Sequence, residues 1–252
     1  MSVAATSGIY ESARLLADYL FFHYGEGESF TPEFQIPRHA LGFPRRVVRE
    51  LGGEALGGGR ALDLGCAVGG STFELARTFD EVIGIDFSAS FIEAAGILRG
   101  EGQLICPIPE EGERTRPFTA KVPAGVDRGR TRFEVGDAMD LRCDIGEFDA
   151  VLAANLLCRL PAPGRFLQRL PSLTRPEGLL LLATPFSWLP EFTPREFWLG
   201  GKPGDPPSFD ILKSILTPSF TLLRTVELPF LIREHARKYQ YGISLGSIWR
   251  RK

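Results

Sequence analysis

Ala61-Leu62-Asp63-Leu64-Gly65-Cys66-Ala67-Val68-Gly69-Gly70 is the stretch that decides the fold of this 252-residue chain. A short apolar run ends in a glycine-rich turn, and the residues that follow, 71–78, have helical spacing. Gly65 and Gly69 permit a tight turn and let the backbone approach a ligand where a Cβ would obstruct it. A strand that ends in such a turn and opens a helix predicts a ligand-binding turn of an α/β fold.

The spacing of the glycines separates two kinds of cofactor site. The fingerprint of nicotinamide dinucleotide folds is G-x-G-x-x-G, and Gly65, Gly69 and Gly70 break that spacing. Asp63 lies two residues before the first glycine. The loop therefore resembles the D-x-G-x-G-x-G loop of S-adenosylmethionine-dependent methyltransferases, with Ala67 in place of the middle glycine. This resemblance implies S-adenosylmethionine as the cofactor, and a purely structural turn is the alternative interpretation.

Short apolar runs alternate with helical stretches along the chain. Strands are predicted at 60–64, 81–85, 132–135, 148–153 and 178–183, and helices at 9–23, 44–51, 71–78, 89–99, 164–173 and 209–216. Nearly continuous apolar strands that alternate with helices indicate a doubly wound parallel sheet covered on both faces. Segments 221–228 and 242–249 are predicted to add an antiparallel edge hairpin. The expectation is a Rossmann-like, class I methyltransferase fold with a mostly parallel, seven-stranded sheet.

The length is near the upper limit for one hydrophobic core, so a single domain is expected over residues 1–252. Residues 1–57 are expected to form an N-terminal helical arm. Two segments do not fit the α/β rhythm, namely the proline-containing insertion 101–130 and the insertion 185–207, which is rich in Trp, Phe, Pro and Gly. Segments this long between elements are usually lids or binding loops, and a lid is expected for 185–207.

Composition and charge exclude several classes of protein. A net charge of −2 and a pI near 6 lack the electrostatic signature of nucleic-acid binding. The four cysteines form no C-x-x-C pair, so no metal site and no disulfide framework are expected. The first residues lack a secretion signal, and no apolar run is long enough to cross a bilayer. We expect a cytoplasmic protein with a small-molecule partner and no membrane partner.

Acidic residues follow successive predicted strands, at the strand ends where open α/β sheets bind ligands. Asp63 can accept hydrogen bonds from an ammonium group or from ordered water. Asp86 lies about 20 residues beyond the first loop, the position of ribose recognition, and Phe87 is expected beside the adenine. Asp86 as a helix N-cap is the alternative, but Ser88 can fill that role. Asp137 is expected to meet the adenine amino group. The expected cofactor-binding residues are Arg45, Asp63, Gly65, Cys66, Ala67, Gly69, Asp86, Phe87, Ser88, Asp137, Ala138, Met139 and Asn155.

Several blocks outside the loop are not general methyltransferase features. The most distinctive are Thr193-Pro194-Arg195-Glu196 with Trp198-Leu199-Gly200-Gly201, and Ile232-Arg233-Glu234-His235-Ala236-Arg237-Lys238-Tyr239-Gln240. Further blocks lie at 19–25, 62–69, 82–88 and 152–156. Through them, almost the whole chain resembles the 4-mercaptohistidine (5-thiohistidine) N-methyltransferases of ovothiol biosynthesis. These are usually met as the C-terminal domain of ovothiol synthases, and here a standalone enzyme is expected.

This resemblance implies transfer of the S-adenosylmethionine methyl group to the imidazole Nπ of 5-thiohistidine, which gives ovothiol A. Two alternatives stay open, namely 5-selenohistidine of the ovoselenol pathway as acceptor, and a cofactor-binding partner domain without catalysis. Asn155, His23 and Tyr24 are the expected catalytic residues. The expected substrate-binding residues are Tyr24, Arg195, Trp198, Arg233, His235, Lys238 and Tyr239. For these side chains, packing at a helix end, core packing, local ion pairs and solvated surface charge remain alternatives.

Overall fold

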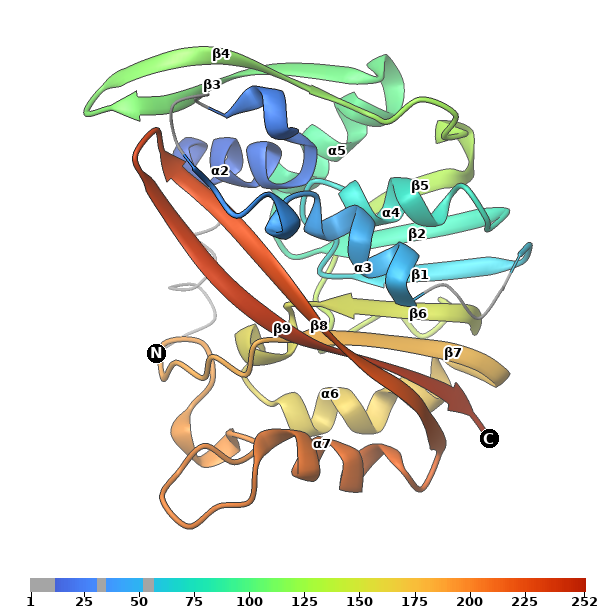
Figure 1. Ribbon diagram of the computed structural model, residues 1–252. Coiled ribbons are helices and arrows are strands. Elements are labelled where there is room, and N and C mark those ends of the chain that lie inside the picture. The colour runs from blue at the N-terminus through green and yellow to red at the C-terminus, as the bar shows by residue number, and fades with distance from the viewer. Residues whose placement is uncertain (1–11, 31–34, 52–56) are drawn as a thin grey trace.

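The apolar runs of the sequence pair into one seven-stranded sheet in a computed structural model that describes residues 12–30, 35–51 and 57–252 (Figure 1). The strand order is β5-β2-β1-β6-β7-β9-β8. The strands are β1 (Arg60–Leu64), β2 (Glu81–Asp86), β5 (Thr131–Val135), β6 (Phe148–Ala154), β7 (Thr174–Thr184), β8 (Phe220–His235) and β9 (Lys238–Arg251). The first five run parallel, whereas β9 is antiparallel to both β7 and β8. The predicted class I fold with its antiparallel edge hairpin is confirmed.

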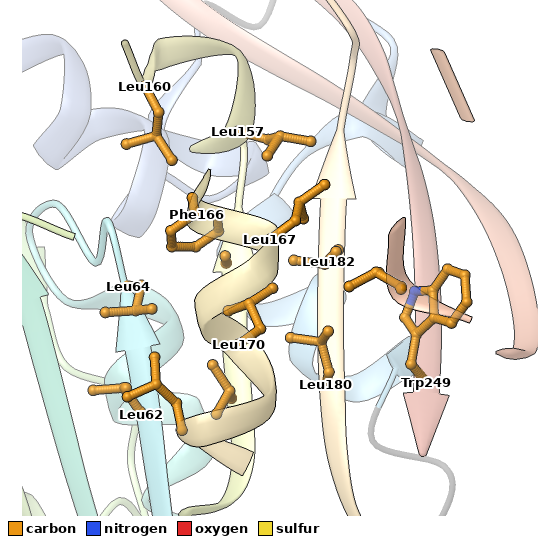
Figure 2. Packing of buried hydrophobic residues seen from close by; sticks show 14 of the residues in the cluster. Leu62, Leu64, Leu157, Leu160, Phe166, Leu167, Leu170, Leu180, Leu182 and Trp249 are labelled. Carbon is orange, nitrogen blue, oxygen red and sulfur yellow. The ribbon is translucent and has the colours of Figure 1, made fainter. Parts of the chain in front are cut away.

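Helices cover both faces of this sheet. They are α2 (Ala13–Tyr24), α3 (Phe43–Leu51), α4 (Gly70–Leu75), α5 (Ala89–Glu101), α6 (Pro163–Arg169) and α7 (Ser208–Leu216). Leu62 and Leu64 point to the face under α6 and α7, where Phe166 and Trp249 complete the cluster (Figure 2). Ala61, one position before Leu62, points to the opposite face under α3 and α4. Burial on both faces explains why the strands are continuous apolar runs.

The insertion 101–130 forms a hairpin of its own. Strands β3 (Gln103–Glu111) and β4 (Arg114–Lys121) pair antiparallel and pack on α2 and α5. Its inward side chains are Cys106, Ile108, Phe118 and Ala120. Prolines are compatible with this two-stranded ribbon because both strands are edge strands, where missing N–H donors are tolerated. In the sequence, those prolines interrupt the alternation of apolar and polar residues that predicts a strand, so the sequence predicts no strand there.

The C-terminal hairpin is longer than the predicted segments 221–228 and 242–249. The last residue of β7, Thr184, pairs with Leu245, so residues 229–244 extend past the carboxyl edge of the parallel strands. This distal half crosses the molecule toward α2 and the β3–β4 hairpin (Figure 1). The charged block 233–239, which the sequence set apart, is its tip.

Three predicted helices differ at their ends. The helix predicted at 164–173 ends at Arg169 and continues as a 3₁₀ turn, Leu170–Ser172, because Pro171 lacks the N–H that an α-helix needs. The helix predicted at 71–78 ends at Leu75. The start of the helix predicted at 9–23 lies outside the described residues, as do 31–34 and 52–56 of the expected arm. Within the described ranges, no helix has the length and apolar character needed to cross a membrane.

Candidate functional site

Strained backbone gathers at the carboxyl edge of the sheet. Of the four described non-glycine residues with positive φ, three lie just after neighbouring strand ends: Ala67 (47°) after β1, Asn155 (55°) after β6 and Phe186 (50°) after β7. A left-handed conformation costs a residue with a Cβ about 1–2 kcal/mol. Such residues cluster at functional sites. Here they lie at the sheet edge where the acidic residues of the sequence predict a ligand site.

The turn after β1 is fixed by glycine and by β2. Gly65 and Gly69 have φ values of 71° and 85°, and a Cβ on Gly69 would lie 2.7 Å from the Phe133 ring. The amides of Gly65 and Cys66 both donate to the Ile85 carbonyl, at 2.8 and 3.1 Å. The turn is therefore narrow and held against the next strand, as a backbone that approaches a ligand requires.

The end of α2 closes over this turn. The Tyr24 hydroxyl donates to the Val68 carbonyl at 2.7 Å, and the Gly70 amide donates to His23 Nδ1 at 3.0 Å. Burial lowers the pKa of His23 to about 3, so its imidazole is neutral, and burial raises the pKa of the Tyr24 phenol. Both side chains are buried and bonded to the turn. The geometry gives them a positioning role at the turn, and their expected catalytic role stays a prediction.

Asp63 lies buried beneath the turn. Its Oδ2 accepts from Thr72 Oγ1 at 2.6 Å, and burial raises the pKa of the carboxyl to about 7. Nearby Asp86 adds to this increase. Among the described residues, no Lys or Arg forms a salt bridge with Asp63. A buried carboxyl of this kind suits a cationic ligand group. A positive charge beside the carboxyl would lower its pKa and offset the free-energy cost of burying the carboxylate.

The end of β2 has the features of an adenosine site. Asp86 accepts from the Ala67 amide at 2.8 Å and from the Ser88 amide at 3.0 Å, and a carboxylate offers about four acceptor positions. Ser88 is the N-cap of α5, so the alternative role of Asp86 as the cap is excluded. Phe87 and Val135 expose 46% and 57% of their surface beside Asp86. A ribose diol on Asp86 and an adenine against these apolar side chains fit this arrangement.

Other expected cofactor-binding residues make contacts within the protein. Asp137 accepts from the Met139 amide at 2.8 Å, a local turn that leaves Met139 packed against the core beside Ala138. Cys66 is a buried thiol in the turn. Arg45 pairs with Glu26 at 3.1 Å, so its guanidinium has a protein carboxylate where a cofactor carboxylate was expected.

Asn155 stands at the end of β6 in contact with the C-terminal hairpin. Ser244 Oγ donates to the side-chain Oδ1 of Asn155 at 2.6 Å, and the backbone N–H of Asn155 donates to the Ala183 carbonyl at 2.7 Å. Ser244 is fully buried. Sequence reasoning missed Ser244 because 89 residues separate it from Asn155, and no motif marks a single serine in a strand.

The charged residues of the hairpin tip are not brought to Asn155. Lys238 lies six positions before Ser244 in β9, which places the two residues about 20 Å apart at the rise of a strand. Arg233 is buried against Pro109 and Glu110 of β3, Lys238 pairs with Glu234, and Tyr239 donates to Ala236 and stacks on Phe30. His235 accepts from the Arg237 amide at 3.2 Å. These contacts hold the tip, as the alternatives of local ion pairs and packing predict, and the substrate-binding role of the four residues stays a prediction.

Arg195 and Trp198 lie together in the insertion 185–207. The Arg195 guanidinium is 5.6 Å from the Trp198 ring centre, and Trp198 Nε1 donates to the Thr193 carbonyl at 2.8 Å. Thr193 Oγ1 in turn donates to the Leu160 carbonyl at 2.7 Å. The insertion is thus an ordered segment bonded to the connection between β6 and α6, and its two expected substrate residues contact each other.

Comparison with known proteins places the chain in a methyltransferase family. The model of a methyltransferase domain family matches residues 37–219. Magnesium-protoporphyrin O-methyltransferase of Rhodobacter capsulatus is 30% identical over 147 residues, 58% of this chain and 52% of that protein. The chain thus spans about half the length of the curated relatives it matches.

Solved structures share the fold. Magnesium protoporphyrin IX methyltransferase from Synechocystis PCC 6803 with bound SAH matches over all of both chains, with a TM-score of 0.59 and 16% identity. The cyclase SpnF matches with a TM-score of 0.60 and 15% identity, over 97% of this chain and 94% of that one. The family match shows a methyltransferase domain, and a protein crystallised with S-adenosylmethionine shares its fold, in agreement with the predicted cofactor.

Proposed function

This chain belongs to the methyltransferase domain family, and on that premise we propose that it is an S-adenosylmethionine-dependent methyltransferase whose acceptor is an imidazole nitrogen of 5-thiohistidine. The observation that carries the proposal is the contiguity of the blocks that resemble 5-thiohistidine N-methyltransferases. Block 19–25 contacts block 62–69 through Tyr24 and Val68. It contacts block 232–240 through Phe21, whose ring centre is 5.2 Å from the Arg233 guanidinium. Blocks distant in sequence are thus in contact through α2, whose end also contacts the cofactor turn.

The chemistry needs positioning more than a strong base. S-adenosylmethionine, when bound, supplies a methyl group on a sulfonium, which becomes a thioether as the C–S bond breaks and the N–C bond forms. A neutral imidazole whose Nπ carries the lone pair attacks without prior deprotonation, and the proton on the other nitrogen leaves to water afterwards. His23 and Tyr24 suit this scheme because both hold the turn. In-line orientation and exclusion of water would then supply the rate.

Two other acceptor classes compete with 5-thiohistidine. 5-Selenohistidine has the same ring with a larger chalcogen. The curated relatives are named O-methyltransferases, so an oxygen acceptor is the second competitor. A domain that binds the cofactor without methyl transfer is the alternative of a different kind.

Mass spectrometry separates these possibilities. The purified chain is incubated with S-adenosylmethionine and, in separate reactions, with 5-thiohistidine, 5-selenohistidine and histidine. We expect one added methyl group on nitrogen with 5-thiohistidine. No methylated product, or methyl on sulfur, contradicts the acceptor. Calorimetric titration with S-adenosylhomocysteine then distinguishes an inactive cofactor-binding domain, which binds it, from a misassigned cofactor site, which does not.

A further inference from the structure

We infer that Ser244 is a positioning residue that orients the Asn155 carboxamide, so that the amide N–H groups face the methyl acceptor and bind its anionic chalcogen. The inference rests on the proposed function, because it assigns the group that keeps the sulfur of 5-thiohistidine away from the methyl group. Sulfur is a softer nucleophile than the imidazole nitrogen, so a nitrogen methyltransferase for this substrate must restrain it.

The position of Asn155 is fixed at two points. Its backbone amide bonds to Ala183 of β7, and its Oδ1 bonds to the fully buried Ser244 of β9. Its left-handed backbone, with φ of 55°, is one that asparagine tolerates better than most residues. A planar amide with its oxygen and backbone held has one orientation left for Nδ2.

That orientation directs Nδ2 away from β9. In the strand order, β7 and β9 lie on one side of β6, whereas β1 and the cofactor turn lie on the other. Leu156, next to Asn155, already lies against the turn, with a side-chain carbon 3.0 Å from a Cβ built on Gly65. No described residue accepts a hydrogen bond from Asn155 Nδ2. The amide nitrogen therefore presents two donors on the side of the methyl donor.

Two N–H donors select the chemistry of the acceptor. They can hold a thiolate or selenolate through charge-assisted hydrogen bonds, which leaves the ring nitrogen to face the methyl group. An amide turned the other way would present its oxygen and repel an anionic chalcogen. The site thus fits a heteroaromatic ring that carries an anionic chalcogen on a carbon not bonded to the nucleophilic nitrogen.

Ser244→Ala tests the inference against a matched control, Ser247→Ala. Ser247 is also buried on β9, but it donates to Leu182 and accepts from Trp249 at 2.9 Å, away from Asn155. We expect Ser244→Ala to lower kcat/KM for 5-thiohistidine about tenfold and to raise the share of S-methyl product. Affinity for S-adenosylhomocysteine should stay within about twofold, and Ser244→Thr, which keeps the hydroxyl, should restore the product ratio. A Ser244→Ala enzyme with the product ratio of Ser247→Ala overturns the inference.

A second readout needs no turnover. Asn155 is the only asparagine in the chain, so labelling with [¹⁵N]asparagine yields one side-chain NH₂ pair in the NMR spectrum. In the S-adenosylhomocysteine complex, this pair should shift and exchange faster with water in Ser244→Ala, but not in Ser247→Ala. Addition of 5-thiohistidine should shift it in the wild type. An unchanged pair in Ser244→Ala refutes the positioning, whereas an inactive wild type with the expected NMR change refutes only the proposed acceptor.

Discussion

The cofactor turn at 65–70 and the distal hairpin at 229–244 meet the same edge of the sheet, but different forces hold them there. The turn is fixed by its own glycines and by the adjacent strand β2. The hairpin depends on partners far away in sequence, since Arg233 is paired with Glu110 of the β3–β4 hairpin, 123 residues earlier. The first region therefore depends mainly on local residues, with a link to α2, whereas the second depends on the insertion that it contacts.

A substitution in the turn should give the largest effect. Gly69→Ala combines a φ of 85° with a Cβ 2.7 Å from Phe133, so strain and overpacking should lower the free energy of unfolding by about 2–5 kcal/mol and abolish cofactor binding. Thermal unfolding and calorimetry measure both. Gly96→Ala, in open space on α5, is the control and should stabilise the fold slightly. Equal behaviour of the two variants would contradict a turn fixed by glycine.

Removal of one charge should next release the hairpin tip. Glu110→Gln leaves the Arg233 guanidinium, whose side chain is 2% exposed, without its ion pair, which should lower the free energy of unfolding by about 3 kcal/mol. Denaturant unfolding measures this change. The control is Glu111→Gln, whose partner Arg114 and own side chain are more than 80% exposed, so little change is expected. If Glu110→Gln is as stable as the control, the tip is held by packing alone.

The pH dependence of cofactor affinity sharpens the description of the turn. The pKa of Asp63 is raised to about 7 from an ordinary 3.8, so between these pH values the folded protein without ligand holds a proton that the unfolded chain has lost. The contribution of this carboxyl to folding stability is therefore complete below about pH 4 and is lost as pH rises through 7. A cationic ligand group favours the carboxylate. Affinity for S-adenosylhomocysteine should therefore rise about tenfold between roughly pH 6 and 8.

Calorimetry at several pH values tests this dependence. Asp63→Asn should remove it. Asp18→Asn is the necessary comparison, because burial also raises the pKa of Asp18 to about 6 although it lies on the α2 face toward the hairpin. Dependence that persists in Asp63→Asn but disappears in Asp18→Asn would move the titrating group from the turn to the hairpin contact.

The smallest effect should come from the link between α2 and the turn. Tyr24→Phe removes the buried hydrogen bond to Val68, so the free energy of unfolding should fall by about 1 kcal/mol and cofactor affinity by about fivefold. Tyr241→Phe, which removes an exposed contact with His39, is the matched control. Unchanged affinity in Tyr24→Phe would show that α2 covers the turn without helping to order it.

Most of the sheet could be predicted because it follows short-range rules. Strands buried on both faces are apolar at every position, and each expected parallel strand was found within a few residues of its bounds. Asp63, Gly65, Gly69 and Asp86 lie where the loop spacing placed them, since strand ends and φ preferences are local properties. The cofactor followed from the same ten residues.

The sequence by itself thus determined the alternation of strands and helices, the turn and its methyl donor. Only the tertiary structure decided that 101–130 is a hairpin, that His23 and Tyr24 hold the turn, and that Arg233 has Glu110 as its partner. It alone also brought Ser244 to Asn155. The reason is physical: each of these contacts joins segments distant in the chain, and a pairing made of many weak long-range interactions leaves no signal in the residues on either side of it.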